Sequence, residues 1–115
     1  MPRDRDLDAL RDVLFSARLA IEYVAAGEYE VFAKDTQFQD SVIRRVELIG
    51  EAARRASADA HRRWPDLPWR EMVDMRNVMI HEYDAVDLRI VWDTVERDLP
   101  PLVARLETIL SSQAD

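Results

Sequence analysis

Apolar residues recur at intervals of three and four along most of the chain, and this spacing places side chains on one face of an α-helix. The first stripe predicts a helix from about residue 6 to residue 26, and it consists of Leu7, Leu10, Leu14, Ala17, Ile21 and Val24. Gly27 follows directly, where helices often end in a left-handed cap. The pattern therefore predicts a long amphipathic first helix that stops at a glycine.

A second stripe predicts a helix that begins after Thr36 and breaks at Pro65, with the inward residues Phe38, Val42, Val46, Ile49, Ala53 and Ala56. Thr36 and Gln39 have the spacing of a capping box. Gly50 costs this helix about 1 kcal/mol relative to alanine, and the neighbouring Ala52 is also small. We therefore expect another helix to approach closely at Gly50.

Two more helices are predicted in the second half of the chain. Pro68 suits the first turn of a third helix, which should fray around residues 81–84 and which carries Trp69, Met72, Val73, Met75, Met79 and Ile80. Asp87 can cap a last helix, whose stripe is Leu88, Trp92, Val95, Leu99, Leu102, Leu106 and Ile109. This rhythm passes through Pro100 and Pro101 without interruption, which predicts one long helix kinked at the two prolines.

The predicted elements make an all-α fold: an up-and-down bundle of four helices, or of five if the kink at Pro100 and Pro101 divides the last one. The chain has only two glycines and no extended alternating stretch, which argues against strands. Its 115 residues suit a single domain over residues 1–115.

The composition narrows the chemistry. The absence of cysteine excludes disulfides and thiolate sites, and two histidines are too few for a histidine-rich metal centre. We therefore predict no metal and no cofactor. No apolar run approaches the roughly 20 residues of a membrane span, and the first residues lack the apolar core of a signal peptide. A soluble, cytoplasmic protein is expected.

The segment RNVMIHEY places four chemically useful side chains near the end of the predicted third helix. Arg76 can grip a phosphate through two N–H groups, His81 can move a proton near neutral pH, and Tyr83 offers a hydroxyl. Asn77 and His81 lie one turn apart on one helix face. The last helical turn also favours a protonated imidazole by a few tenths to about 1 kcal/mol. Together these groups fit phosphoryl chemistry.

The same residues have ordinary structural explanations. A histidine at a helix end can cap it, an Arg–Asn pair can connect helices, and a tyrosine in a turn can anchor the chain. Glu51, in the small-residue segment IGEAA, could orient Arg76, although a solvated carboxylate is the simpler interpretation. His61, beside two arginines at a helix end, is assigned no direct role.

The net charge of −7, from 16 basic and 23 acidic residues, counts against a nucleic-acid ligand, because such ligands usually require a basic surface. Arginines nevertheless cluster locally. Arg44, Arg45 and Arg54 are our candidates for contacts with a nucleic acid, although paired arginines on a helix are mostly solvated. The surplus of acidic residues could instead serve an arginine-rich partner.

The spacing Arg-x4-His-x-Tyr resembles the signature of the HEPN superfamily and, within it, of the HepT-like ribonuclease toxins. The similarity covers nearly the whole chain and includes IGEAA (residues 49–53), Leu67-Pro68-Trp69, Val91-Trp92 and Leu99-Pro100. The resemblance implies an all-α bundle, homodimerisation through the motif helices, and metal-independent endoribonuclease activity. It also implies that Arg76 and His81 are the catalytic pair.

The resemblance further implies a partner, a minimal nucleotidyltransferase antitoxin that transfers AMP from ATP onto the motif tyrosine, here Tyr83. A bulky anionic group beside Arg76 would compete with an RNA phosphate. Glu82 adds a negative charge that must point away from a bound phosphate. The expected partners are thus RNA, this antitoxin and a second copy of the chain, with no DNA and no membrane.

Cleavage of RNA by its own 2′-hydroxyl needs a base for that hydroxyl, an acid for the 5′-oxygen and a cation for the phosphorane. One His81 cannot make both proton transfers at once, so we hypothesise that a two-fold dimer brings two copies of Arg76 and His81 to one cleft, with Asn77, Tyr83 and Glu51 in support. Apolar residues off the inward stripes make a dimer face plausible, namely Tyr23, Tyr29, Phe32, Leu48 and Trp64. The alternative is a non-catalytic helical subunit that docks onto a nucleotidyltransferase.

Overall fold

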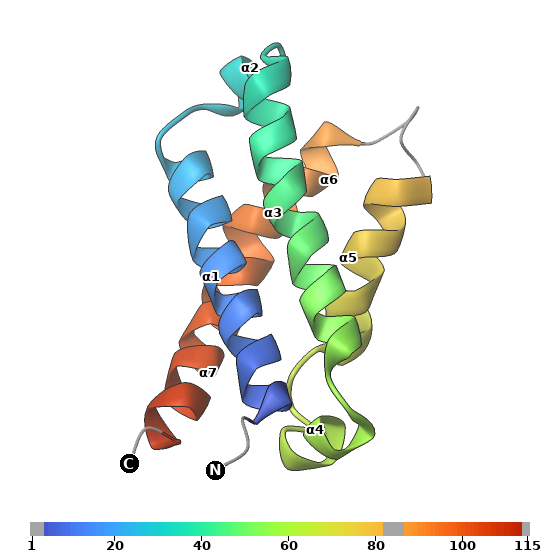
Figure 1. Ribbon diagram of the computed structural model, residues 1–115. Coiled ribbons are helices and arrows are strands. Elements are labelled where there is room, and N and C mark those ends of the chain that lie inside the picture. Colours follow the sequence, from blue (N-terminus) through green and yellow to red (C-terminus); the bar gives the residue numbers. More distant parts are fainter. Residues whose placement is uncertain (1–3, 82–86, 114–115) are drawn as a thin grey trace.

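The computed structural model describes residues 4–81 and 87–113, with backbone only for residues 77–81. The described part consists of helices and short connections, without strands. In chain order its elements are α1 (Arg5–Ala25), α2 (Tyr29–Phe32), α3 (Thr36–Arg55), α4 (Ala58–Arg63), α5 (Trp69–His81), α6 (Leu88–Asp93), the π-helix η1 (Thr94–Asp98) and α7 (Leu99–Ser112). The long helices alternate in direction, which confirms the predicted all-α, up-and-down bundle (Figure 1).

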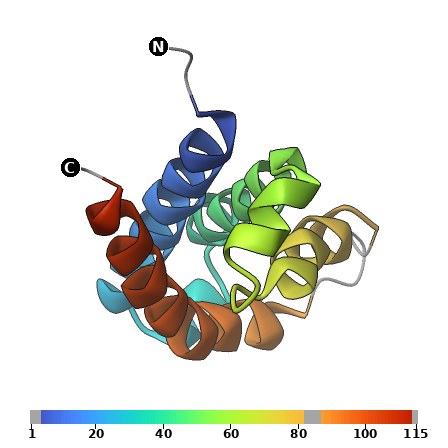
Figure 2. The ribbon, with the colours of Figure 1, turned by 90° about the horizontal axis from the view of Figure 1, so that it is seen from below.

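The four long helices are α1, α3, α5 and α7, of which α1 and α3 pack against each other at the centre. One side of the bundle is a row of α1, α3 and α5, in which α3 lies between the other two (Figure 1). Helix α7 packs on α1 and closes the other side (Figure 2). The two flanks of α3 therefore face different neighbours, and this decides which side chains can meet.

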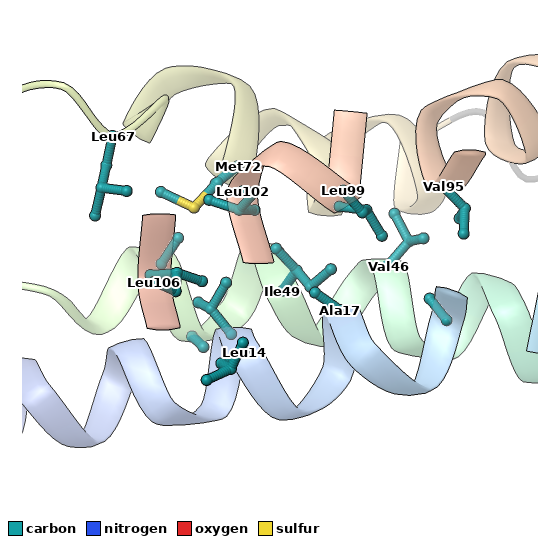
Figure 3. Close-up of a cluster of buried hydrophobic side chains, with 14 of the residues drawn as sticks. Leu14, Ala17, Val46, Ile49, Leu67, Met72, Val95, Leu99, Leu102 and Leu106 are labelled. Atoms are coloured by element: carbon teal, nitrogen blue, oxygen red, sulfur yellow. The ribbon is translucent and has the colours of Figure 1, made fainter. Parts of the chain in front are cut away.

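The core is filled mainly by aliphatic side chains from the predicted stripes. Side chains from α1, α3, α7 and the start of α5 meet in one cluster (Figure 3). Its fully buried members include Leu10, Val13, Val46, Ile49, Met72, Leu99 and Leu106. Each such side chain contributes about 1.5–3 kcal/mol relative to exposure, so this cluster holds the long helices in register.

The short helix α2 carries aromatic residues into the core, which the sequence analysis did not predict. The Phe32 side chain is 0% exposed, and its ring centroid lies 5.2 Å from those of both Phe38 and Trp92. Tyr29 packs edge-on against Trp92 at 5.7 Å. Trp64 is also buried. The idea that these off-stripe residues form a dimer face is therefore wrong for Phe32 and Trp64, because they fill the core of their own chain.

Gly27 does not adopt the predicted left-handed conformation, since no glycine has a positive φ in the described residues. It has a different reason to lack a side chain. A Cβ at Gly27 would lie 2.6 Å from Cε2 of Phe38. The glycine therefore makes room for the Phe38 ring where the chain leaves α1.

The predicted capping box at the start of α3 is also wrong. The N-cap is Asp35, whose carboxylate accepts a hydrogen bond from the Phe38 N–H at 3.1 Å. Gln39 instead donates to the Phe32 carbonyl at 2.9 Å. A carboxylate one residue earlier is a better acceptor for the first free N–H groups than the Thr36 hydroxyl.

Helix α3 ends at Arg55 and does not continue to Pro65 as predicted. Ser57 interrupts it by capping α4, where its hydroxyl accepts from the Ala60 N–H at 3.3 Å. The Ser57 N–H and hydroxyl also donate to the Asp6 carboxylate at 2.9 and 2.6 Å. These bonds join the break to the start of α1, so a tertiary contact outweighs the helical periodicity.

The last predicted helix is continuous from Leu88 to Ser112, but its irregular turn precedes the proline pair. Residues 94–98 form a π-helix, and the Leu99 N–H donates to the Thr94 carbonyl five residues back. Pro100 and Pro101 then occupy the first turn of α7, where their missing N–H groups cost least. The wider turn thus absorbs the irregularity expected at the prolines. No helix in residues 4–81 and 87–113 is long and apolar enough to cross a membrane.

Candidate active site

Helices α3 and α5 approach most closely where Gly50 meets Arg76. A Cβ at Gly50 would lie 2.5 Å from Cβ of Arg76 and 2.6 Å from its backbone nitrogen. A Cβ atom essentially never comes this close to a non-bonded heavy atom, so only glycine fits here without moving α5. The close approach predicted at Gly50 is therefore confirmed, and its partner is the first residue of the motif.

The next residue of α3 places a carboxylate beside the same arginine. The Nε of Arg76 and Oε1 of Glu51 are 3.6 Å apart, and their side chains are 30% and 43% exposed. This distance is too long for a hydrogen bond, and pairs open to solvent contribute at most about 1 kcal/mol. The structure thus brings Glu51 and Arg76 together, in a loose ion pair that an incoming anion could displace.

The start of α5 is fixed by the core, which determines where Arg76 lies. Trp69 is buried and donates its Nε1–H to the Trp64 carbonyl at 2.9 Å. The ring of His61 stacks on that of Trp69, with centroids 4.3 Å apart. Met72, one turn before Arg76, is fully buried. His61 therefore has a packing contact and is again assigned no direct role. The Arg76 guanidinium is carried on a helix whose first turns are held by the core.

The rest of the motif is only partly described. Helix α5 runs through His81, so positions 76, 77 and 81 belong to one continuous helix. At about 100° per residue, positions 77 and 81 share a face, whereas positions 76 and 81 lie about 140° apart around the axis. The side chains of Asn77 and His81 and the whole of Tyr83 lie outside the described residues.

Comparison with known proteins agrees with the motif. The family described as "Ribonuclease HepT-like" matches residues 13–109. The chain belongs to the HepT-like ribonuclease family. "Probable ribonuclease HepT" from Thermococcus cleftensis is 39% identical over 102 residues, which cover 89% of this chain and 93% of that protein. "Putative RNase MJ1380" from Methanocaldococcus jannaschii is 37% identical over 106 residues, which cover 91% and 97%. No solved structure matches the chain significantly.

The three arginines that we selected as RNA contacts do not converge in this HepT-like chain. Arg44 forms an ion pair with Glu47 at 3.8 Å on the outer face of α3. Arg45 lines a hollow between α1 and α3. Arg54 is exposed in the last turn of α3 and has no ion-pair partner within the part of the chain that the structure describes. Neighbouring positions on a helix point about 100° apart, so Arg44 and Arg45 leave α3 in different directions, and their role as RNA contacts stays a prediction.

The sequence analysis missed one residue that the fold brings to notice. Phe15 is 60% exposed on α1, beside the same hollow as Arg45. Its signal in the sequence is an aromatic residue between Leu14 and the next inward position, off the apolar stripe of the first helix. Without the position of α3, that signal could not be separated from ordinary surface packing.

Proposed function

We propose that this HepT-like protein is the metal-independent endoribonuclease toxin of a toxin–antitoxin pair. The observation that carries the proposal is the position of Arg76, a partly exposed guanidinium on the motif helix that is only loosely paired with Glu51. A guanidinium held in this way suits a phosphate, because its planar N–H groups match two phosphate oxygens. The names of the relatives as ribonucleases support RNA as the source of that phosphate.

In the proposed reaction, the 2′-oxygen of a ribose attacks the adjacent phosphorus while a base removes its proton. The P–O bond to the 5′-oxygen breaks, and an acid gives that oxygen a proton. The products are a 2′,3′-cyclic phosphate and a 5′-hydroxyl, so no water is consumed in this step. Arg76 stabilises the charge on the non-bridging oxygens, and His81 supplies proton transfer.

A homodimer completes this mechanism. Positions 76 and 81 of one chain lie about 140° apart around the axis of α5, so a single helix carries the two catalytic positions on different faces. Across a two-fold axis, His81 acts as base and the partner subunit's His81 acts as acid. The cleft between two motif helices then holds one scissile phosphate.

The proposed regulator is a nucleotidyltransferase antitoxin that moves AMP from ATP to the Tyr83 hydroxyl, releasing pyrophosphate. The added phosphodiester would bring negative charge to the motif and compete with RNA for Arg76. Mass spectrometry after incubation with the antitoxin and ATP should place AMP on Tyr83 and find none on Tyr83→Phe. AMP on another residue would refute this assignment.

The ribonuclease proposal is tested by incubating the protein with RNA in the presence of a chelator. Wild type should leave 2′,3′-cyclic phosphate ends, whereas Arg76→Ala and His81→Ala should lose at least about 100-fold in rate, the size of one lost acid–base or electrostatic contribution. Arg70→Ala, an exposed arginine on the same helix, is the matched control and should cleave like wild type. Equal cleavage by all four samples would indicate a contaminating nuclease and refute the proposal.

The net charge of −7 favours one second candidate, a non-catalytic subunit that docks onto a nucleotidyltransferase. Acidic proteins repel RNA unless basic groups are gathered locally. On this alternative, Arg76→Ala would alter binding to the nucleotidyltransferase, and the protein would leave RNA intact.

A further inference from the structure

Two hollows lie beside each other along α1 and α3. Helix α1 borders α3 on the side opposite α5 (Figure 1). One, of about 250 Å³, is lined by residues that include Phe15, Arg45 and Arg55. The other, of about 510 Å³, is lined by Arg5, Asp8, Ala9, Asp12 and Arg55. Asp12 and Arg55 line both. We call the two hollows together the α1–α3 trough, and from Arg5 to Ser16 their lining residues follow α1 for about 17 Å.

The trough has a surplus of unpaired positive charge although the chain is acidic. Both carboxylates along it are neutralised, since Asp12 pairs with Arg55 at 2.6 Å and Asp8 pairs with Arg11 at 3.0 Å. Arg5 and Arg45 line the trough without an ion-pair partner among the described residues. Two free guanidiniums along one groove favour a ligand with repeated negative charges.

Phe15 adds a flat apolar surface at the Arg45 end of the trough. Its side chain is 60% exposed, and among the side chains that the structure describes, the other large apolar ones with comparable exposure, Val31 and Ile90, belong to α2 and α6. Phe15 is the one aromatic ring among the residues that line this hollow, where two apolar residues lie beside polar and charged ones: Leu48, Ala52, Asp12, Ser16, Arg45 and Arg55. Interfaces between protein subunits are depleted of charge at their centres, whereas a lone aromatic ring beside basic groups is the usual platform for a nucleic-acid base.

We propose that the α1–α3 trough binds a single-stranded segment of the RNA substrate, with one base stacked on Phe15 and phosphates near Arg45 and Arg5. This inference rests on the proposed ribonuclease function. Helix α3, about 10 Å in diameter, separates the trough from Arg76, so a strand that crosses its outer face reaches both. Binding on both flanks of α3 explains how a protein with a net charge of −7 holds RNA.

Binding is tested on the full chain with a fluorescent oligonucleotide of about 12 nucleotides whose 2′-O-methyl groups prevent cleavage. Phe15→Ala should weaken binding by about five- to hundredfold, the effect of removing one stacked base, while Phe15→Trp should retain it. Arg45→Ala should weaken binding and lower the dependence of log affinity on log salt by about one unit. Ile90→Ala, which removes an equally exposed side chain from α6, is the control and should bind like wild type.

Three further measurements separate the possible failures. With cleavable RNA, Phe15→Ala should raise KM and leave kcat unchanged, and an abasic oligonucleotide should bind wild type and Phe15→Ala equally. If Phe15→Ala binds like wild type while cleavage still requires Arg76, the proposal that RNA binds in the trough is wrong and the proposed function stands. If wild type neither binds nor cleaves RNA, both are wrong. If Phe15→Ala dissociates a dimer in sedimentation, Phe15 is a subunit contact and the trough is again refuted.

Discussion

Gly50 and Arg76 meet through their backbones at the crossing of α3 and α5. The missing side chain at Gly50 is what allows this, because a Cβ there would lie 2.5 Å from Cβ of Arg76 and 2.6 Å from its nitrogen. The same crossing puts Glu51 beside the guanidinium. The position of the motif cation on α5 thus depends on the absence of one methyl group from α3.

We expect Gly50→Ala to destabilise the protein although alanine is the better helix former. The gain in helix propensity is about 1 kcal/mol, but the new methyl group would overlap backbone atoms of α5, which cannot rotate away as a side chain can. Overpacking of this kind costs about 1–3 kcal/mol, and the loss should appear in urea unfolding. Cleavage of RNA should fall as well, because Arg76 moves with α5.

Gly27→Ala is the matched comparison, since it is the only other glycine in the chain. A Cβ there meets the edge of the Phe38 ring rather than backbone. Gly27→Ala should therefore change the free energy of unfolding in urea without lowering the cleavage rate of the folded protein. If Gly50→Ala is more stable than wild type and fully active, the close approach does not constrain the site.

Glu51→Gln should tighten RNA binding. Glu51 and Arg76 are 3.6 Å apart and both partly exposed, so a phosphate must compete with the carboxylate for the guanidinium. Two charges about 4 Å apart in water interact by about 1 kcal/mol, which corresponds to roughly fivefold in affinity. Measured with the 2′-O-methyl oligonucleotide, the gain should shrink at high salt, where such interactions are screened. Weaker binding by Glu51→Gln would instead mean that Glu51 holds Arg76 in its binding orientation.

Much of the bundle follows from the sequence because its long helices are amphipathic. The stripe through Leu10, Leu14 and Ala17 is buried as predicted, and so is the stripe through Leu99 and Leu106. Periodicity of this kind reports a helix only when it lasts for several turns. It therefore identifies α1, α3, α5 and α7 and says little about short elements.

The missed features depend on contacts between distant parts of the chain. Helix α2 has four residues, too few to show a period, and it exists because Phe32 enters the aromatic cluster around Trp92. The break at Ser57 depends on Asp6, 51 positions away.

The candidate site likewise has features that the sequence predicts and features that only the structure shows. The small residues around Gly50 and Glu51 were enough to predict that another helix crosses there. The different surroundings of Arg44 and Arg45, and the exposure of Phe15, could not be predicted, because they depend on which helix lies on each flank of α3.

Phe32→Ala should destabilise the protein strongly. The ring is completely buried and packs against two other aromatic rings, and truncation of such a residue costs about 3–5 kcal/mol. Val31→Ala, on the same short helix but 52% exposed, should change the free energy of unfolding by no more than about 0.5 kcal/mol. Urea unfolding of both variants checks the assignment. Equal effects would mean that α2 does not insert its aromatic residue into the core.

The carboxylate of Asp4 links stability to pH at the start of α1. Its Oδ1 accepts hydrogen bonds from the N–H groups of Asp6 and Leu7 at 3.0 and 3.1 Å, and its Oδ2 accepts one from Arg63 at 3.2 Å. The bond from Leu7, followed by the contacts with Arg63, lowers the pKa of Asp4 below its usual 3.8. The folded protein therefore binds fewer protons here than the unfolded chain. This contribution is fully present above the unfolded pKa and is lost as pH falls through the folded one.

Two variants of Asp4 separate the cap from the charge. Asp4→Ala removes both and should cost about 1 kcal/mol at neutral pH, whereas Asp4→Asn keeps an N-cap acceptor and should cost less. Because asparagine does not titrate, the stability difference between wild type and Asp4→Asn should shrink as pH falls below 3.8, the usual value for this carboxyl. Urea unfolding from about pH 7 down to about pH 2.5 measures this difference. A difference that stays constant over this range would show that the Asp4 charge does not contribute to stability through a shifted pKa.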